Sequence, residues 1–232
     1  MLHEPQNLQV LFEDNHLIAV NKPAGLLVQS DHTGAFCLLE TVRQYLREQY
    51  EKPGDAYVGL LHRLDRPVSG VVLFAKTSKG ASRLSDQIRK RTVQKTYHAL
   101  VEGKPKATSG TLENHLREVA IGHPVEVLDV AIETSKDARL SYRVLETGAQ
   151  FSLVEIDLHT GRKHQIRAQM AHIGCPIAGD RLYGAKLAFE APVANALGLV
   201  AYSLEFSHPV RPLERVKVTV PVLPREMWQA WL

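Results

Sequence analysis

The sequence predicts an α+β protein built on a mixed, largely antiparallel sheet with flanking helices. Three observations lead to this fold class: short β-rich segments are numerous, helical segments are few, and strand-like segments often follow one another directly. The 232 residues are 44% hydrophobic and 23% charged, as in an ordinary globular protein, and no linker composition divides them. We therefore expect one domain over residues 1–232, with a central cleft.

The N-terminal part of the chain predicts a hairpin followed by a helix and a buried strand. Residues 8–12 and 16–20 are short and β-rich, and the turn-like sequence EDN separates them. Apolar residues at helical spacing predict an amphipathic helix over about 36–50. The segment VVLFAK, residues 71–76, has the composition of a buried strand.

Strand-like segments dominate the rest of the chain. Residues 78–90 predict a helix with Ser78 as its N-cap, and the alternating segment TVQKTYHALVEG, residues 92–103, predicts a strand. The other expected elements are strands at about 109–117, 125–132, 139–146, 151–158, 200–206 and 215–220, a helix over 162–174, and a short helix after Pro224.

Several classes of protein and site are not supported by the sequence. The N-terminal residues lack the basic and apolar regions of a signal peptide, and no apolar run approaches the length of a membrane span. Cys37 and Cys175 have no partner spacing and indicate reduced thiols in a cytoplasmic protein. No HExxH, CxxC, P-loop, GxGxxG or GxSxG motif is present, so we expect neither a metal site nor a nucleotide cofactor.

The charges are separated along the chain, although the formal net charge is only +3. Residues 76–106 hold nine Lys/Arg against two acids, whereas residues 113–157 hold nine acids against four Lys/Arg. Separated basic stretches can present a positive face to a polyanion. The alternative explanation is that these charges belong to solvated helix faces.

The segment HRLDRPVSG, residues 62–70, places Asp65 between two arginines. An aspartate that attacks a substrate in a dry pocket needs an arginine partner, because burial alone would raise its pKa and favour the neutral acid. Arg63, Arg66 and a distant arginine are candidates, and Arg167 on the expected helix over 162–174 would orient the carboxylate well. The alternative is an ion pair that only ties a loop to a helix.

This segment resembles the HRLDxxTSG motif of the RluA family of RNA pseudouridine synthases. LFEDNHLIAVNKPAGLLV resembles the first motif of the family, QKTYHALVEG its tyrosine strand, HTGRKHQIRAQMAHIGCPIAGDRLYG its long third motif, and LEFSHP its late strand. The similarity runs in order from residue 8 to about 221. Since no S4-type module precedes the first motif, the resemblance implies the short, single-domain branch of the family.

The resemblance implies the pseudouridine synthase fold and specific roles for residues of this chain. Asp65 would be the essential carboxylate, Arg167 its salt-bridge partner, and Tyr97 the ring that stacks on the uracil. Arg63 would enter the RNA stack beside the flipped base. The other residues expected to contact RNA are His62, Arg66, Lys95, Arg162, Lys163 and His164.

Two positions depart from the family pattern. Val68 stands where the family has threonine, and LVA, residues 199–201, stands where the family usually has LHA. We expect the loss of the hydroxyl at Val68 to be a small structural change, because this hydroxyl is not the reacting group. The contribution of the missing histidine to RNA contact is absent at Val200.

The resemblance predicts an isomerase that converts specific uridines of structured RNA, either rRNA or tRNA, to pseudouridine without a cofactor or a metal. We expect a monomer with no membrane partner. Two alternatives remain at the level of the sequence: a non-catalytic RNA-binding protein on the same scaffold, and a hydrolase with an aspartyl nucleophile. The hydrolase would need a water-activating His/Asp pair, for which the sequence gives no convincing candidate.

Overall fold

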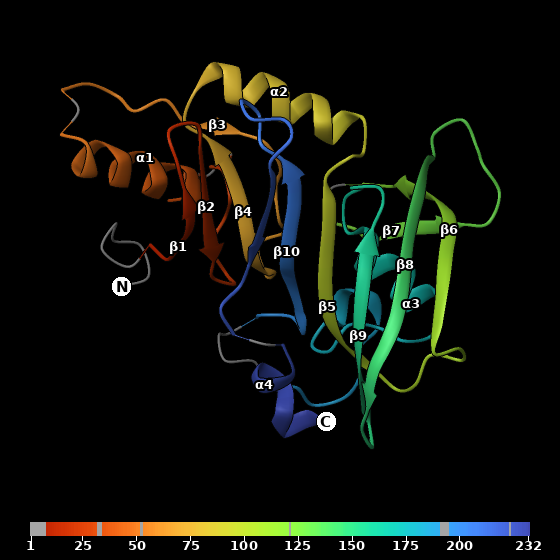
Figure 1. The fold of residues 1–232 in the computed structure, drawn as a ribbon. Coiled ribbons are helices and arrows are strands. Elements are labelled where there is room, and N and C mark those ends of the chain that lie inside the picture. The colour runs from red at the N-terminus through yellow and green to blue at the C-terminus, as the bar shows by residue number, and fades with distance from the viewer. Residues whose placement is uncertain (1–7, 32–33, 52, 121, 191–194, 223) are drawn as a thin grey trace. The chain divides into compact units, whose positions relative to one another are not determined.

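Alternating and fully apolar segments of this sequence form strands, and the few segments with helical periodicity form helices. The computed structural model describes residues 8–31, 34–51, 53–120, 122–190, 195–222 and 224–232 (Figure 1). The chain divides into two compact units. The first comprises residues 1–93 and 203–220, and the second comprises residues 94–202 and 221–232.

The first unit holds strands in the order β1-β2-β4-β10. Their bounds are β1 Val10–Glu13, β2 Leu17–Lys22, β3 Gly59–Leu60, β4 Ser69–Ala75, β10 Leu199–Ser207 and β11 Arg215–Thr219, with Ser203–Ser207 of β10 in this unit. β3 pairs with β4 and β11 with β10, both antiparallel. The first four residues of β2 are fully buried, which explains the unbroken apolar run of this strand.

Two helices accompany these strands, α1 Leu38–Gln49 and α2 Ser78–Arg89. α2 packs against β3 and β4, and its buried Leu84 belongs to the core. The N-cap of α2 is Thr77, whose hydroxyl accepts a hydrogen bond from the backbone N–H of Gly80 at 3.1 Å. The prediction of Ser78 as the N-cap was therefore wrong by one residue, since both neighbours are good capping residues.

Two residues after its last helical residue, each helix is followed by a non-glycine residue with left-handed backbone. Glu51 follows α1 with a φ of 47°, and Arg91 follows α2 with a φ of 59°. This conformation costs a residue with a side chain about 1–2 kcal/mol. A cation at a helix C-terminus gains only about 0.3–1 kcal/mol from the helix dipole. The dipole therefore does not offset the conformational cost at Arg91.

The second unit contains an antiparallel sheet in the order β5-β9-β8-β6-β7. Its strands are β5 Gln94–Glu102, β6 Ser109–Glu118, β7 Val125–Leu128, β8 Lys136–Thr147 and β9 Phe151–Leu158. Helix α3, Gln165–His172, packs against β6 and β7 (Figure 1). The remaining elements are η2 Arg181–Tyr183, α4 Pro224–Trp228 and η3 Gln229–Trp231.

The α+β class and the largely antiparallel pairing are confirmed. Each expected strand and helix is present, although β3 and the 3₁₀ helices η2 and η3 were missed. Helix α3 is shorter than the predicted range 162–174, because His164 has a φ of 52° and Ile173 caps the other end. The single domain expected over residues 1–232 stays a prediction. In the part of the chain that the structure describes, no helix is long and apolar enough to cross a membrane.

Candidate active site

Asp65 begins a tight turn in the first unit, immediately before β4. The backbone N–H of Val68 donates to the Asp65 carbonyl at 3.0 Å, which closes the turn over residues 65–68. Val68 itself is buried in the core. The turn therefore forms with valine at the position where threonine was expected, and β4 supports it as a buried strand.

The buried Lys22 holds this turn in place through hydrogen bonds, and the sequence analysis assigned Lys22 no role. Lys22 is fully buried at the end of β2. Its Nζ donates to the carbonyl oxygens of Pro23 at 3.0 Å, Leu26 at 2.8 Å and Arg66 at 3.1 Å. An ammonium has three N–H groups, and each of them has an acceptor here. The lysine thereby joins the loop after β2 to the residue that follows Asp65.

The same two loops are also joined directly. The N–H of Gly25 donates to the Arg66 carbonyl at 2.8 Å, and Nε of Arg66 donates to the Gly25 carbonyl at 2.9 Å. Gly25 has a φ of 87°, so this reciprocal contact uses the left-handed conformation that glycine adopts without strain. The residue next to Asp65 is thus held by three hydrogen bonds to two residues.

Opposing effects act on the pKa of Lys22, and burial is the largest of them. Burial lowers the pKa of Lys22 to about 7, while the negative charge of Asp65 raises it and the nearby Arg66 lowers it. Asp65 and Lys22 therefore attract each other electrostatically within the first unit. A buried lysine of this kind is unusual, because lysine is almost never fully buried without partners.

Arg167 lies on α3 in the second unit and is held by Asp180. Nε of Arg167 donates to Oδ2 of Asp180 at 2.6 Å, and Nη2 donates to Oδ1 at 2.8 Å. The Arg167 side chain is only 7% exposed and that of Asp180 only 1%. This bidentate, buried pair fixes the plane of the guanidinium. Asp180 lies in the long third motif, but the sequence analysis assigned it no role.

Tyr183 on η2 supports the same arginine. The Arg167 Cζ lies 5.0 Å from the centre of the Tyr183 ring, within the range of a cation–π contact. The Tyr183 hydroxyl accepts from the backbone N–H of Val125 at 2.8 Å and lies 3.0 Å from Nδ1 of His164, within hydrogen-bond distance. His164, the left-handed residue before α3, is thereby held in place.

A buried polar network shapes the loop before α3. Gln165 accepts from the Thr160 hydroxyl at 2.7 Å and from the Arg162 backbone N–H at 3.1 Å. Its Nε2 donates to the Arg139 carbonyl at 3.1 Å and to Oε1 of Gln169 at 3.0 Å. The apolar stripe predicted α3, but it gave no signal that two glutamines of the helix are buried and bonded.

Tyr97 is buried on β5 opposite Ile156 of β9. Its neighbour His98 points to the other face of the sheet, as the alternation of a strand requires. His98 packs against Tyr202 at 4.5 Å between ring centres, and its Nε2 lies 3.4 Å from Glu155. Burial lowers the pKa of His98, against the opposing effect of Glu155.

The residues expected to contact RNA have the following surroundings. Arg63 is exposed, whereas Nε2 of His62 accepts from the Leu73 backbone N–H at 3.0 Å. Arg162 donates to the Asp137 carbonyl at 2.9 Å, and Lys163 lies 3.3 Å from Glu118. Lys95 lies on β5, and the surroundings of Arg66 and His164 are described above. Asp65 and Arg63 belong to the first unit, whereas Tyr97 and Arg167 belong to the second.

The other departure from the family motifs lies at the start of β10. Leu199, Val200 and Ala201 are all buried. Valine at position 200 is therefore part of the core, and it fills this position with an apolar side chain.

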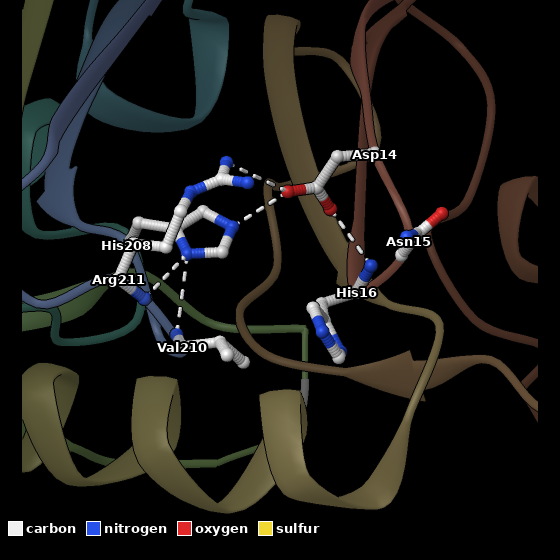
Figure 2. A pocket seen from close by; sticks show the side chains of 6 residues that line it. All are labelled: Asp14, Asn15, His16, His208, Val210 and Arg211. Carbon is white, nitrogen blue, oxygen red and sulfur yellow. Dashed lines mark hydrogen bonds and ion pairs between the residues drawn. The ribbon is translucent and has the colours of Figure 1, made fainter.

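A pocket of about 290 Å³ elsewhere in the first unit is lined by Asp14, Asn15, His16, His208, Val210 and Arg211 (Figure 2). Nδ1 of His208 accepts from the backbone N–H groups of Val210 at 3.2 Å and Arg211 at 2.9 Å, so its Nε2–H donates to Asp14 at 2.6 Å. Burial would raise the pKa of Asp14, but hydrogen bonds from His16 and His208 hold it below its usual value. These polar groups bond one another and tie the β1–β2 turn to the loop after β10.

Cys37 and Cys175 are both buried and free. Among the residues that the structure describes, no three His, Cys, Asp or Glu side chains are grouped to hold a metal ion.

A family model described as RNA pseudouridylate synthase matches residues 16–172. This range includes the Asp65 turn, the strand of Tyr97 and the helix of Arg167. The chain belongs to this family. Relatives named as large-subunit rRNA and tRNA pseudouridine synthases confirm the assignment to the RluA type.

Relatives with assigned names agree with this family. The ribosomal large subunit pseudouridine synthase D of Xylella fastidiosa is 36% identical over 236 residues, which cover 96% of this chain and 68% of the relative. The tRNA pseudouridine synthase C of Yersinia pestis is 35% identical over 226 residues, which cover 88% of this chain and 82% of the relative. The ribosomal relative of the same name from Nitrosomonas europaea is also 36% identical, and the match spans only 58% of its length.

A solved structure supports the fold. The human protein RNA pseudouridylate synthase domain containing 4 superimposes with a TM-score of 0.78 at 24% sequence identity. The match covers 95% of this chain and 93% of the human chain. The predicted pseudouridine synthase fold is thereby confirmed.

Proposed function

We propose that this RNA pseudouridylate synthase family member isomerises uridine to pseudouridine in structured RNA. One observation carries the proposal: Asp65 stands in the turn that carries the family's aspartate motif, and the backbone carbonyl of the next residue, Arg66, accepts hydrogen bonds from the buried Lys22 at 3.1 Å and from the Gly25 N–H at 2.8 Å. A carboxylate on a fixed backbone is what a nucleophile or a base needs. A protein that only bound RNA would not need this arrangement.

The reaction balances without any added group. The bond between N1 and C1′ breaks, the uracil turns, and a bond between C5 and C1′ forms, while a proton leaves C5 and one returns to N1. Because atoms and electrons are conserved, neither an oxidant nor an energy source takes part. Asp65 supplies the carboxylate that acts at the sugar or the base. Both nucleophilic attack and removal of the 2′ proton are compatible with that role.

Tyr97 and Arg167 complete the proposed catalytic set. The target uridine leaves its stack at a cost of a few kcal/mol. Stacking on the Tyr97 ring returns about 1–3 kcal/mol of that cost. The family motif gives Arg167 the role of positive partner of the carboxylate, and Asp180 and Tyr183 orient its guanidinium. The roles of Tyr97 and Arg167 come from the family motifs, position by position.

The RNA substrate is rRNA or tRNA, since relatives of comparable identity carry both kinds of name. Arg63 would enter the stack beside the flipped base, and it is exposed as that role requires. Phosphate contacts from the lysines and arginines predicted above would supply the rest of the affinity. Mapping pseudouridines in total RNA, with and without the gene, identifies the RNA and the position.

The decisive experiment measures tritium release from RNA labelled at uridine C5. The wild-type chain should release tritium, and Asp65→Asn should release none while it unfolds at a similar temperature. Asp55→Asn is the matched control, because Asp55 is an exposed carboxylate of the same unit, and it should retain the wild-type rate. Undiminished release by Asp65→Asn would sink the proposal. RNA binding without release by the wild-type chain would favour the non-catalytic alternative.

A further inference from the structure

The C-terminal end of α2 carries three consecutive exposed cations, Arg89, Lys90 and Arg91. Residues 78–92 contain five Lys/Arg but a single acid, Asp86. Asp86 pairs with both Arg89 and Lys90, so one carboxylate serves two cations. Arg91 makes no side-chain hydrogen bond or ion pair with any of the described residues. The helix end therefore presents an uncompensated positive charge to solvent.

This helix end is held rigidly within the first unit. The Gln87 side chain donates to the Ser207 carbonyl at 2.8 Å and accepts from the Ser207 N–H at 3.1 Å. Nη1 of Arg83 donates to the Pro209 carbonyl at 2.7 Å. Cations on a rigid element lose less freedom when they bind an anion than cations on a loop.

The backbone at Arg91 is that of a Schellman cap: the N–H of Arg91 donates to the Ile88 carbonyl at 3.1 Å, and the N–H of Thr92 donates to the Gln87 carbonyl at 3.0 Å. Arg91 adopts the left-handed conformation, in which glycine is the residue without strain. Arg89 and Lys90 already supply cations to the helix C-terminus without strain, and the cost at Arg91 exceeds what the dipole returns. The cap is made by backbone groups alone, so the exposed Arg91 side chain is available to an anion.

We propose that Arg89, Lys90 and Arg91 form a contact for the phosphate backbone of the substrate RNA. The inference rests on the proposed function, because it takes RNA as the partner. The phosphates of an RNA backbone carry closely spaced negative charges, and a guanidinium donates two parallel hydrogen bonds to one phosphate. None of the three residues belongs to the motifs that carry the family resemblance.

Arg91→Gly separates this role from stability. The variant removes the charge and the backbone strain together, so it should unfold at the wild-type temperature or above. It should also bind fluorescein-labelled bulk tRNA about three- to tenfold more weakly at 0.1 M salt, with a salt dependence smaller by about one phosphate contact. Arg91→Asn, which tolerates the same backbone conformation, should behave in the same way.

Two control variants complete the test. Glu51→Gly relieves the same backbone conformation at the end of α1 in the same unit, and it should not weaken RNA binding. Arg91→Lys retains the charge and should bind like the wild-type chain. Wild-type affinity and an unchanged salt dependence in both Arg91→Gly and Arg91→Asn would overturn the contact.

The two proposals fail in different ways. A wild-type chain that binds RNA but releases no tritium contradicts the proposed function and leaves the binding test of Arg91 valid. Normal tritium release, combined with wild-type RNA affinity in Arg91→Gly, contradicts the phosphate contact alone.

Discussion

The ammonium of Lys22 donates a hydrogen bond to the backbone carbonyl of Arg66, 44 positions later in the chain. Arg66 follows Asp65, so this bond connects the first and second sequence motifs at the residue next to the candidate carboxylate. The lysine is fully buried and has two further carbonyl acceptors. The position of the Asp65 turn therefore depends on a charged group in the core.

Replacing Lys22 with methionine should change how stability depends on pH. The pKa of Lys22 is lowered to about 7 in the folded chain, whereas an unfolded lysine has a pKa of about 10.4. Between these values the unfolded chain holds the extra proton, so this lysine makes the free energy of unfolding rise with pH, by up to about 1.4 kcal/mol per pH unit. Lys22→Met lacks this rise.

Urea unfolding at pH 6 to 9 checks the prediction. The difference between the wild-type chain and Lys22→Met should shift in favour of the wild-type chain as the pH rises. Lys217→Met, at an exposed lysine of the same unit, is the control and should follow the wild-type curve. Parallel curves for the wild-type chain and Lys22→Met would contradict the lowered pKa.

Asp180→Asn should destabilise the chain strongly. It removes one charge of a buried pair and leaves the Arg167 guanidinium facing an amide, which costs about 3–5 kcal/mol. Arg143→Gln breaks an ion pair with Glu155 in which the arginine is 65% exposed, so solvent screening makes its effect far smaller. Denaturant unfolding of both variants checks the contrast. Equal losses would show that the Arg167–Asp180 pair adds nothing beyond a surface pair.

The strands and helices were predictable because their periodicities are strong. The alternating segment of β5 and the apolar run of β4 leave little choice of element or face. The ends were less predictable: adjacent threonine and serine both favour the N-cap of α2, and propensity alone does not choose between them. Helix α3 begins later than predicted because His164 has left-handed backbone, and a histidine gives no sequence signal for that conformation.

The candidate site was predictable only where family motifs mark it. Asp65, Tyr97 and Arg167 follow from the resemblance, and their roles remain predictions. Lys22 and Asp180 were missed, because a charged residue is expected in solvent unless its partners are known. The signal for Lys22 was a lysine directly after an apolar strand and before the turn residues PAG. The three carbonyl acceptors of Lys22 are backbone atoms, which no sequence pattern identifies.

Thr77→Ala should lower the free energy of unfolding by about 1 kcal/mol, within a range of about 0.5–2. The Thr77 hydroxyl accepts from the Gly80 N–H at 3.1 Å and lies 3.1 Å from Nδ1 of His16. Ser78→Ala is the matched control one residue later, and it should change stability by less than about 0.5 kcal/mol because Ser78 is exposed. A larger loss in Ser78→Ala than in Thr77→Ala would restore the cap that the sequence predicted.

Tyr183→Phe should separate the hydroxyl from the ring that supports Arg167. The ring stays beside the guanidinium, but the backbone N–H of Val125 loses its acceptor, which costs about 1–3 kcal/mol when such a donor is buried. We expect Tyr183→Phe to be destabilised while it retains most of the tritium release. Tyr183→Ala removes the ring as well, so its release per folded molecule should fall further. Equal release per folded molecule in the two variants would show that the ring does not orient Arg167.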